Sequence, residues 1–400
     1  MSLANYIIWD PSTELFRIGF LAVRWYSLMI ICTFLCGRQL VSYFFEKEGR
    51  PVEDVDKFTL YILLFCLIGA RLGEVFFYNS AYYLKHPFEA ILPVRFSPYF
   101  QFTGYQGLSY HGALLGGIIA VYLYAKYHIT FSLFPWRFRI VRQQRKGQNF
   151  LWLLTPLAFG VLMGFFVRIG NFINSEIIGT PTHKKYGVLF AHNVVHSLQN
   201  CSPIIQKAKV LKNKEATASA TPENYQPIIL ALTIKKAGLD EKTIEHFLTH
   251  QLKNYLATSQ IIQEHVYEPA EKPLDYTLTK NRKQGYIAHI KTLGIPRHPV
   301  QLYESFSYIL TLLGLFYWWK QKGNSLRQGV IAGFATIISY SFRFIYEFFK
   351  APFNVLIEGN YPITTGHLLS LLTVLLGVFI IVYAYLFANN EQNNQLNTRE

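Results

Sequence analysis

Seven apolar stretches recur along the chain, and most approach the roughly 20 residues that an α-helix needs to cross a bilayer. They cover about residues 20–45, 58–77, 110–127, 150–179, 298–319, 329–350 and 364–387. Because a spanning helix satisfies its backbone polar groups internally, repeated runs of this length favour a helical membrane protein. We therefore expect an all-α polytopic membrane protein with about seven transmembrane helices.

The amino-acid composition also favours a membrane protein over a soluble multidomain protein or a nucleic-acid-binding protein. The chain is 51% hydrophobic and only 16% charged, which is too apolar for the two or three soluble domains that 400 residues would allow. Its net charge of +14 lies largely in loops and one long polar segment. That distribution favours positive-inside loops and contact with anionic membrane lipids over nucleic-acid binding. The first apolar run lacks a basic n-region and a cleavage site, so we expect it to be retained rather than removed as a signal peptide.

The long polar segment between the fourth and fifth apolar runs differs from the rest of the chain. We expect four parts: residues 1–179 with helices 1–4, an enlarged extracytoplasmic loop subdomain at 180–297, helices 5–7 at 298–388, and a cytoplasmic tail at 389–400. Within the subdomain, apolar residues at helical spacing after Asp240 predict an amphipathic helix over 240–256. Residues 207–219 are interpreted as a flexible, solvated connection.

Basic residues in the short loops predict the orientation. Loops 45–57, 128–150 and 320–328 carry 3, 5 and 3 lysines and arginines, whereas loops 78–110 and 351–363 carry 2 and 0. Cytoplasmic loops are enriched in these residues, so the first set is predicted to be cytoplasmic. Seven helices then place the N-terminus outside, the C-terminus in the cytoplasm, and the long segment 180–297 outside.

An arginine inside the fourth apolar run is not explained by a plain membrane anchor. Arg168 lies within 164–179, and a charged side chain at the centre of a spanning helix costs roughly 2.5–3.5 kcal/mol on insertion scales. On a continuous helix, Arg168, Asn171 and Ser175 share one face, so a cation and an amide can point into one cavity. An anionic ligand or a partner carboxylate would offset the cost. The alternative is an interfacial arginine that extends to water.

Polar groups from separate helices are predicted to converge at one membrane depth. On the predicted topology, they lie near the outer side: His111, Arg168, Asn171, Glu176, Arg297, His298 and Gln301. Convergence favours one shared site, although His111 alone can equally be structural. Arg343 and Glu347, four residues apart on one helix, can also form a self-neutralising pair. Gly112 and Gly116 are spaced to let another helix approach closely.

Short motifs run through nearly the whole chain outside the long polar segment. They occupy residues 24–29, 70–73, 77–79, 110–116, 168–176, 297–304, 343–349 and 366–370. In this order they resemble phosphatidylglycerol–prolipoprotein diacylglyceryl transferases, the first enzymes of bacterial lipoprotein maturation, and 168–176 is the most specific motif. The chain departs from the family pattern at four positions: Val167, Ala113 and Ser175 replace glycines, and Tyr340 lies one position nearer Arg343 than the family tyrosine.

The resemblance implies transfer of diacylglyceryl from phosphatidylglycerol to the lipobox cysteine thiol of a prolipoprotein, forming a thioether and releasing glycerol phosphate. Arg168 and Arg343 are expected to bind the phosphate bidentately, and His111 to take the thiol proton. Tyr26 is the fourth catalytic candidate, and Glu347 is expected to hold Arg343. The expected substrate-binding residues are Arg168, Asn171, Glu176, Gly179, Arg343, Glu347, His298 and Gln301.

The same resemblance sets the expected partners and location. The partners are phosphatidylglycerol, the prolipoprotein signal peptide with its lipobox cysteine and other membrane lipids, in the bacterial cytoplasmic (inner) membrane. No metal or other cofactor is expected, because the aspartates all lie outside the predicted helices and metal-dependent phosphatidyl transferases need them clustered there. The alternative function is a transporter or flippase for an anionic lipid, but neither obvious inverted repeats nor paired broken helices support it.

Overall fold

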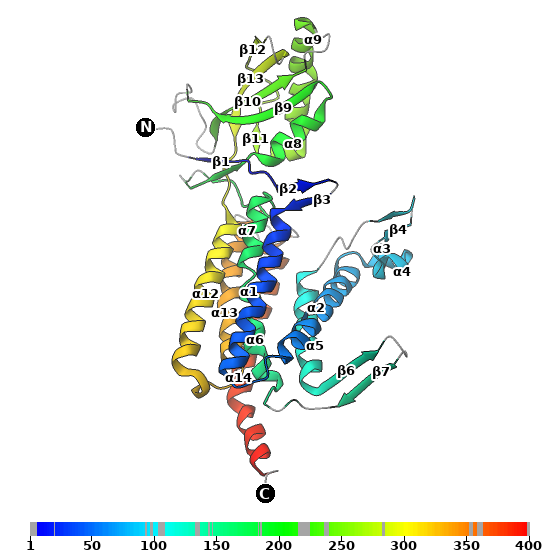
Figure 1. Cartoon of the computed structure of the whole chain (residues 1–400). Helices are drawn as coiled ribbons and strands as arrows, with labels where there is room; N and C mark the ends of the chain where they lie inside the picture. Colours follow the sequence, from blue (N-terminus) through cyan, green and yellow to red (C-terminus); the bar gives the residue numbers. More distant parts are fainter. Residues whose placement is uncertain are drawn as a thin grey trace. The chain divides into compact units, whose positions relative to one another are not determined.

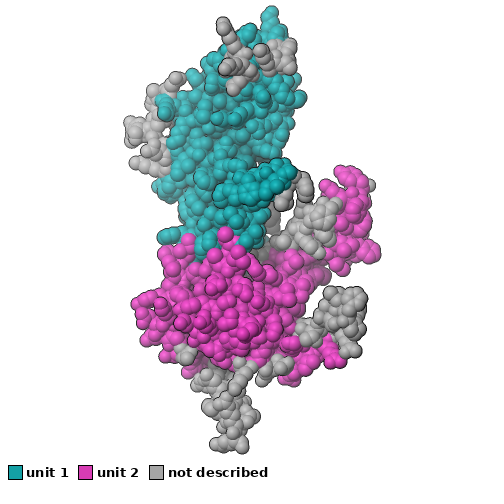
Figure 2. Space-filling view, in the orientation of Figure 1, with its two compact units in different colours: residues 1–31, 164–308, 341–371 teal, residues 32–163, 309–340, 372–400 magenta. Residues whose placement is uncertain are grey.

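The chain divides into two compact units, each built from several separate stretches (Figure 2). Unit 1 comprises Met1–Ile31, Gly164–Tyr308 and Ser341–Leu371, and unit 2 comprises Cys32–Met163, Ile309–Tyr340 and Leu372–Glu400. The computed structural model describes residues 6–19, 21–92, 94–96, 99–102, 109–132, 137–142, 145, 147–182, 184, 186–214, 225–235, 240–281, 285–351, 355–357 and 363–397.

A helix occupies each of the seven apolar stretches (Figure 1). They are α1 (Trp25–Lys47), α2 (Asp54–Gly73) continued by the π-helix η1 (Glu74–Tyr78), α5 (Tyr110–Lys126), α6 (Phe150–Leu162) followed by α7 (Phe165–Ile173), α12 (Val300–Lys322), α13 (Val330–Glu347) and α14 (Thr365–Asn397). Four stretches are both long and apolar enough to cross a membrane: Trp25–Lys47, Asp54–Phe76, Phe150–Ile173 and Thr365–Leu386. The prediction of several membrane-spanning helices is therefore confirmed in this coarser form.

Glycines let α2 and α5 pack closely within unit 2. A Cβ atom added to Gly112 would overlap the carbonyl oxygen of Gly69, and one added to Gly116 would overlap that of Phe65. Gly73 lies at the same contact between α2 and α5, since a Cβ atom added to it would be 2.9 Å from the Gly112 Cα. The predicted small-residue pair is thus confirmed as a helix-packing surface.

Aromatic side chains pack α1, α6 and α12 together in unit 2. The ring of Phe44 lies 5.4 Å from that of Trp152 and 4.9 Å from that of Trp319. The indole Nε1 of Trp319 donates a hydrogen bond to Glu48 at 2.9 Å, so this large side chain also satisfies its one polar atom.

The polar segment between α7 and α12 contains a five-stranded sheet in unit 1, so the all-α prediction is wrong here. The strands are β9 (Ile205–Lys212), β10 (Gln226–Ile234), β11 (Val266–Tyr267), β12 (Tyr276–Asn281) and β13 (Gly285–Gly294). Their order is β11–β13–β10–β9, and β12 also pairs with β13. Alternate residues of β10 are fully buried, namely Ile228, Leu230, Leu232 and Ile234. This period of two is the signature of a strand with one face on a core.

The predicted flexible connection at 207–219 is wrong for the residues that the structure describes. Residues 207–212 belong to β9, which pairs with β10, and Ala208 and Val210 are buried. Lys207 and Lys209 alternate with them on the exposed face. The lysines made the segment look solvated, although Ala208 and Val210 belong to the core. Residues 215–219 lie outside the described part of the chain.

The predicted amphipathic helix over 240–256 is confirmed. It is formed by α9 (Glu241–His246), the π-helix η3 (Phe247–Leu252) and α10 (Lys253–Thr258). Asp240 caps it, because its carboxylate accepts a hydrogen bond from the Thr243 backbone N–H at 3.3 Å. The apolar residues face the core as expected: Ile244, Phe247, Leu248, Leu252 and Leu256 are buried.

The remaining elements are short. They are β1 (Ile7–Trp9), paired in parallel with β8 (Val188–Phe190); the hairpins β2 (Glu14–Ile18) and β3 (Leu21–Arg24), β4 (Val94–Arg95) and β5 (Gln101–Phe102), β6 (Tyr127–Ser132) and β7 (Arg137–Arg142), and β14 (Val355–Ile357) and β15 (Ile363–Thr364); and the helices α3 (Ser80–Lys85), α4 (Pro87–Ile91), α8 (His192–Cys201), α11 (Gln260–Gln263) and the 3-10 turn η4 (Gly323–Ser325).

A buried histidine in the polar segment makes the stability of unit 1 depend on pH. His265 is 0% exposed, and neither ring nitrogen has a hydrogen-bond partner in the described part of the chain. Burial and the positive charge of Arg297 lower the pKa of His265 from 6.5 to about 4. Between these two values the unfolded chain binds a proton that the folded chain does not, so folding becomes less favourable as the pH falls.

We expect acidification from pH 7 to pH 4 to cost about 3 kcal/mol of unfolding free energy through this one group. His265→Leu should remove that part of the pH dependence, and His250→Gln, at an exposed position of η3, should leave it unchanged. Urea titrations of the detergent-solubilised protein at pH 7 and pH 4 measure the difference. An equal loss of stability in wild type and His265→Leu would contradict this assignment.

Candidate active site

The short helix α7 positions Arg168 in unit 1. It starts after Gly164 and ends at Ile173, and the two residues Ser175 and Ile177 beyond it have positive φ angles of 56° and 55°. Ser175 therefore does not continue the helix face that carries Arg168 and Asn171, and that expectation is wrong. The chain turns sharply instead.

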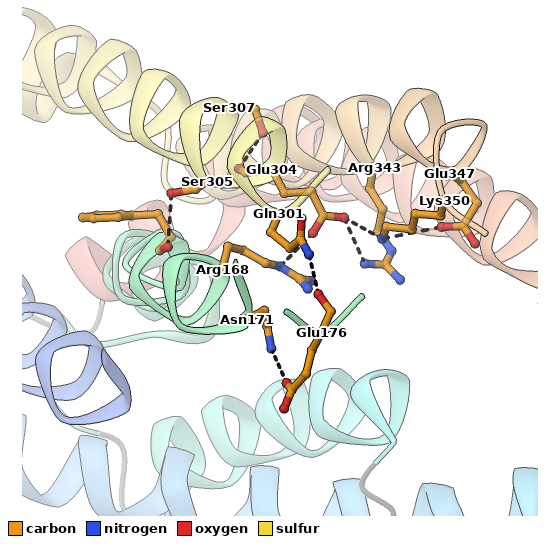
Figure 3. Close-up of polar contacts among 11 residues, drawn as sticks. Arg168, Asn171, Glu176, Gln301, Glu304, Ser305, Ser307, Arg343, Glu347 and Lys350 are labelled. Atoms are coloured by element: carbon orange, nitrogen blue, oxygen red, sulfur yellow. Dashed lines mark hydrogen bonds and ion pairs between the residues drawn. The ribbon is translucent and has the colours of Figure 1, made fainter. Parts of the chain in front are cut away.

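The carboxylate of Glu304 lies at the centre of three cationic side chains (Figure 3). Its Oε2 is 2.9 Å from the Nε of Arg168, and its Oε1 is 2.6 Å from the Nζ of Lys350 and 4.0 Å from the Nη1 of Arg343. The Glu304 side chain is 3% exposed, and those of Arg168 and Lys350 are 13% and 11% exposed. A partner carboxylate thus offsets the cost of placing Arg168 in an apolar helix.

A second carboxylate borders this cluster. Glu347 lies 3.7 Å from the Nζ of Lys350, and it accepts a hydrogen bond from the Thr364 hydroxyl at 3.1 Å. Gly366 approaches the Glu347 carboxylate so closely that a Cβ atom there would overlap it. We expected Glu347 to hold Arg343, and the contacts seen here tie it to Lys350 and to the start of α14.

The five charged groups of this cluster carry an excess of one positive charge. Three cations, Arg168, Arg343 and Lys350, face two carboxylates in a largely buried setting. Water screens such charges less than it does at a surface, so an anionic ligand would be attracted strongly. Guanidinium groups match the oxygens of a phosphate or carboxylate in a forked geometry. The cluster can therefore bind an anion and stabilise negative charge that develops on it.

Amide groups hold Glu176 beside α7. Its carboxylate accepts hydrogen bonds from Asn171 at 3.1 Å and Asn174 at 3.2 Å, and its backbone carbonyl accepts one from the buried Gln301. Figure 3 shows Asn171, Glu176 and Gln301 in this arrangement, next to the ion cluster. The structure therefore brings these three predicted residues together, with Glu176 itself exposed.

Gly179 and His298 lie in a tightly packed backbone crossing. A Cβ atom at Gly179 would lie 2.5 Å from the His298 carbonyl oxygen and 2.7 Å from that of Phe349. The Gly179 N–H donates to His298 at 3.1 Å, while the buried Arg297 donates to the Gly179 carbonyl at 3.0 Å. The His298 ring is within 3.1 Å of the Tyr303 hydroxyl. Glycine is needed here because the backbones cross with no room for a side chain.

Tyr26 packs against α7 at Gly170. A Cβ atom added to Gly170 would lie 2.9 Å from the Tyr26 ring, so the two helices approach closely at this point. The catalytic candidate His111 belongs to unit 2, at the start of α5, and its side chain lies outside the described part of the structure. Its place relative to the cluster remains a prediction.

Sequence reasoning missed Glu304 and Lys350 as site residues. Both stand in or next to motifs that were recognised: Glu304 ends the motif 297–304, and Lys350 follows the motif 343–349. Lys350 is seven residues after Arg343 and three after Glu347, which is a helical spacing that could have indicated it. Among the described residues, no group of three or more histidine, cysteine, aspartate or glutamate side chains is arranged to hold a metal ion.

The fold and this cluster define a multi-pass membrane protein with a largely buried cluster of three cations and two carboxylates. A model of the prolipoprotein diacylglyceryl transferase family matches residues 13–383, and the chain belongs to that family. Relatives named phosphatidylglycerol–prolipoprotein diacylglyceryl transferase include one from Chloroherpeton thalassium, 26% identical over 388 residues and 95% of each chain. Another, from Tolumonas auensis, is 27% identical over 380 residues, 94% of this chain and 96% of the relative.

Replacing Glu304 by glutamine tests whether its carboxylate holds the cluster together. The change keeps the side-chain size but leaves three neighbouring cations without their shared anion. We expect the free energy of unfolding to fall by about 3–5 kcal/mol, as when a buried ion pair loses one partner. Thermal or urea denaturation in detergent measures the loss.

Two further variants show whether the loss of stability in Glu304→Gln comes from the unpaired cations. Adding Lys350→Met removes one cation and should recover part of the loss. Glu14→Gln breaks an exposed pair with Arg17 and should change stability little. A Glu304→Gln protein as stable as the wild type would show that the cations do not depend on this carboxylate.

Proposed function

We propose that this protein transfers the diacylglyceryl group of phosphatidylglycerol to the lipobox cysteine thiol of prolipoproteins. The observation that carries the proposal is the cationic cluster of Arg168, Arg343 and Lys350 around Glu304, whose excess positive charge suits a phosphate leaving group. The names of the relatives agree with this reaction, and nothing favours the transporter or flippase alternative.

The reaction needs two kinds of assistance. The cysteine sulfur attacks the glyceryl carbon that carries the phosphoester oxygen, so a carbon–sulfur bond forms while the carbon–oxygen bond breaks. The bonding electrons leave with glycerol phosphate, and the thiol proton goes to a base. Fixed cations stabilise the charge on the leaving phosphate. A base is needed because a free thiol has a pKa near 8.5 and is mostly protonated at neutral pH.

The proposal assigns a role to each of these residues. Arg168 and Arg343 bind the phosphate, Glu304 and Lys350 hold their geometry, and His111 accepts the thiol proton. Tyr26, which packs against Gly170 of α7, orients the lipid or the base. The remaining proposed substrate-binding or supporting residues are Asn171, Glu176, Gly179, His298, Gln301 and Glu347.

Mixing the purified protein with phosphatidylglycerol and a lipobox peptide tests the function directly. Mass spectrometry should detect the diacylglyceryl thioether and release of one glycerol phosphate for each peptide modified. Lipid translocation in vesicles without any thioether product would instead support the flippase alternative.

The membrane arrangement is part of the proposal. All seven helical stretches cross the bacterial inner membrane, the N-terminus and segment 180–297 lie outside, and the C-terminus lies in the cytoplasm. The loop charges support this orientation. The lipobox cysteine would meet the site from the outer side, with no role for nucleic acid.

Cysteine labelling tests this orientation. In a protein without its native cysteines, Thr277→Cys on β12 should react with an impermeant maleimide in spheroplasts. Gln321→Cys at the end of α12 should react only after permeabilisation. Both side chains are exposed on the surface of the protein, so a difference in labelling reports the side of the membrane on which each one lies. Labelling of position 321 alone in sealed spheroplasts would reverse the topology.

Lysine substitutions test the role of the two arginines. Lysine keeps the charge but cannot form the forked hydrogen bonds of a guanidinium. Arg168→Lys and Arg343→Lys should each lower the rate on the order of 10²–10³-fold, comparable to losing one transition-state donor. Initial rates at saturating lipid measure the effect, and retained wild-type activity in either variant would rule out bidentate binding there.

A pH–rate profile tests His111 separately. His111→Gln should lower the rate roughly 10²–10⁴-fold at neutral pH if the histidine is the general base. Raising the pH should restore part of the rate, because the peptide thiol then ionises unaided. The arginine variants should show no such recovery, since their defect concerns the leaving group. A rate of His111→Gln that does not change with pH would indicate that Tyr26 or Glu176, and not His111, is the general base.

A further inference from the structure

The hairpin of β6 and β7 in unit 2 is a two-stranded sheet of its own (Figure 1). Tyr127–Ser132 pairs with Arg137–Arg142 in antiparallel register, and these strands join no other strand of the described chain. An isolated two-stranded hairpin is marginally stable in water unless one face packs against something. The hairpin therefore needs a surface to lie on.

The register gives the hairpin two different faces. Residues directly opposite each other in an antiparallel pair share a face, and alternate residues of one strand lie on opposite faces. Positions 127, 129, 131, 138, 140 and 142 fall on one face, and in the sequence these are Tyr, Ile, Phe, Phe, Ile and Arg. Positions 128, 130, 132, 137, 139 and 141 fall on the other, and these are His, Thr, Ser, Arg, Arg and Val. The first face is mainly apolar and the second mainly polar and cationic.

At Ile140, no other part of the described chain covers the apolar face. Ile140 is 54% exposed, and its neighbour Val141, on the opposite face, is 53% exposed. The described chain therefore leaves both positions uncovered, and the different composition of the two faces decides which one suits an apolar environment.

The base of the hairpin is fixed to α5. The Arg145 guanidinium donates to the carbonyl oxygens of Tyr124 and Tyr127, at 3.4 Å for the latter, and lies 3.8 Å from the centre of the Tyr124 ring. The chain then enters α6 at Phe150, where the apolar stretch Phe150–Ile173 begins. The hairpin thus leaves one apolar helix and returns to another within a short distance. This tether keeps it near the surface of the bilayer that holds those helices.

Charge identifies the lipid that this surface would meet. Between Lys126 and Gly147 the chain has six cations and no carboxylate: Lys126, Arg137, Arg139, Arg142, Arg145 and Lys146. Cationic residues beside an apolar face are typical of segments that lie in the headgroup region of anionic bilayers. An acidic protein would satisfy the charges but would not explain the attachment at both ends to apolar helices.

We propose that the β6–β7 hairpin is a lipid-binding ribbon. Its face with Ile140 rests on the acyl chains, and its arginines contact the phosphate groups of anionic lipids. This role is separate from catalysis and does not depend on the proposed transfer reaction. It would fix the loop between α5 and α6 against the membrane surface.

Two adjacent positions provide a matched test. The environment-sensitive dye NBD is attached to Ile140→Cys or Val141→Cys in a full-length protein whose native cysteines are replaced by serine. Each protein is placed in nanodiscs of phosphatidylcholine with 30% phosphatidylserine, a ratio of about one anionic lipid in three that gives a negative surface. Phosphatidylserine is used because it is not the proposed substrate. Spin-labelled acyl chains quench from the lipid side, and acrylamide quenches from water.

The proposal predicts opposite results at the two positions. The dye at 140 should be quenched at least threefold more by the lipid quencher than the dye at 141, and acrylamide should show the reverse. Arg139→Gln with Arg142→Gln, or nanodiscs of phosphatidylcholine alone, should reduce the lipid quenching at 140 at least twofold.

Three outcomes would overturn it. Equal access of acrylamide to both positions would mean that the ribbon projects into water. Equal lipid quenching at both would mean that it inserts into the bilayer rather than lying on it. An asymmetry that survives loss of the arginines and of the anionic lipid would mean that anionic headgroups are not its partner.

Discussion

The carboxylate of Glu304 is the interaction on which the rest of the site depends. Two like charges 4 Å apart repel by about 4 kcal/mol at the effective dielectric of a partly buried site, so three cations would not stay together unaided. Burying a carboxylate also costs several kcal/mol, which a single partner seldom offsets. Glu304 contacts Arg168 and Lys350 directly and lies 4.0 Å from Arg343. The cations and the carboxylate therefore each lower the free-energy cost of burying the other.

Hydrogen bonds to backbone carbonyl oxygens connect this cluster to the sheet-containing segment of unit 1. Arg297 donates from Nε to the Glu264 carbonyl at 2.7 Å and from Nη1 to the Gly179 carbonyl at 3.0 Å. The Thr180 N–H donates to the Phe349 carbonyl at 2.7 Å, directly before Lys350. The segment after α7 is thus held on one side by the Arg297 side chain and on the other by a main-chain hydrogen bond. Such fixed backbone is what a forked guanidinium needs if it is to present a set geometry to a phosphate.

Local patterns in the sequence predicted the local structure well. Apolar runs gave the helices, and the spacing after Asp240 gave the amphipathic helix of the subdomain. The sheet was missed because lysines alternate with buried residues in β9, so the segment reads as polar although Ile205, Ala208 and Val210 belong to the core. Lys350 and Glu304 were missed for a different reason. Neither stands out in its own motif, and their importance arises only when α12 and the turn after α13 bring them within 2.6 Å of each other.

The sharp turn after α7 shows why the fourth apolar run could not remain one straight helix. Positive φ angles at Ser175 and Ile177 each cost roughly 1–2 kcal/mol for residues that carry a Cβ atom. Contacts on both sides of the turn compensate: the Glu176 N–H donates to the Asn171 carbonyl at 2.9 Å, and side-chain amides hold the Glu176 carboxylate. A continued helix would carry the chain away from His298 and Phe349, where Gly179 makes its close backbone contacts. The strain at these two residues is therefore a consequence of ending α7 directly beside the ion cluster.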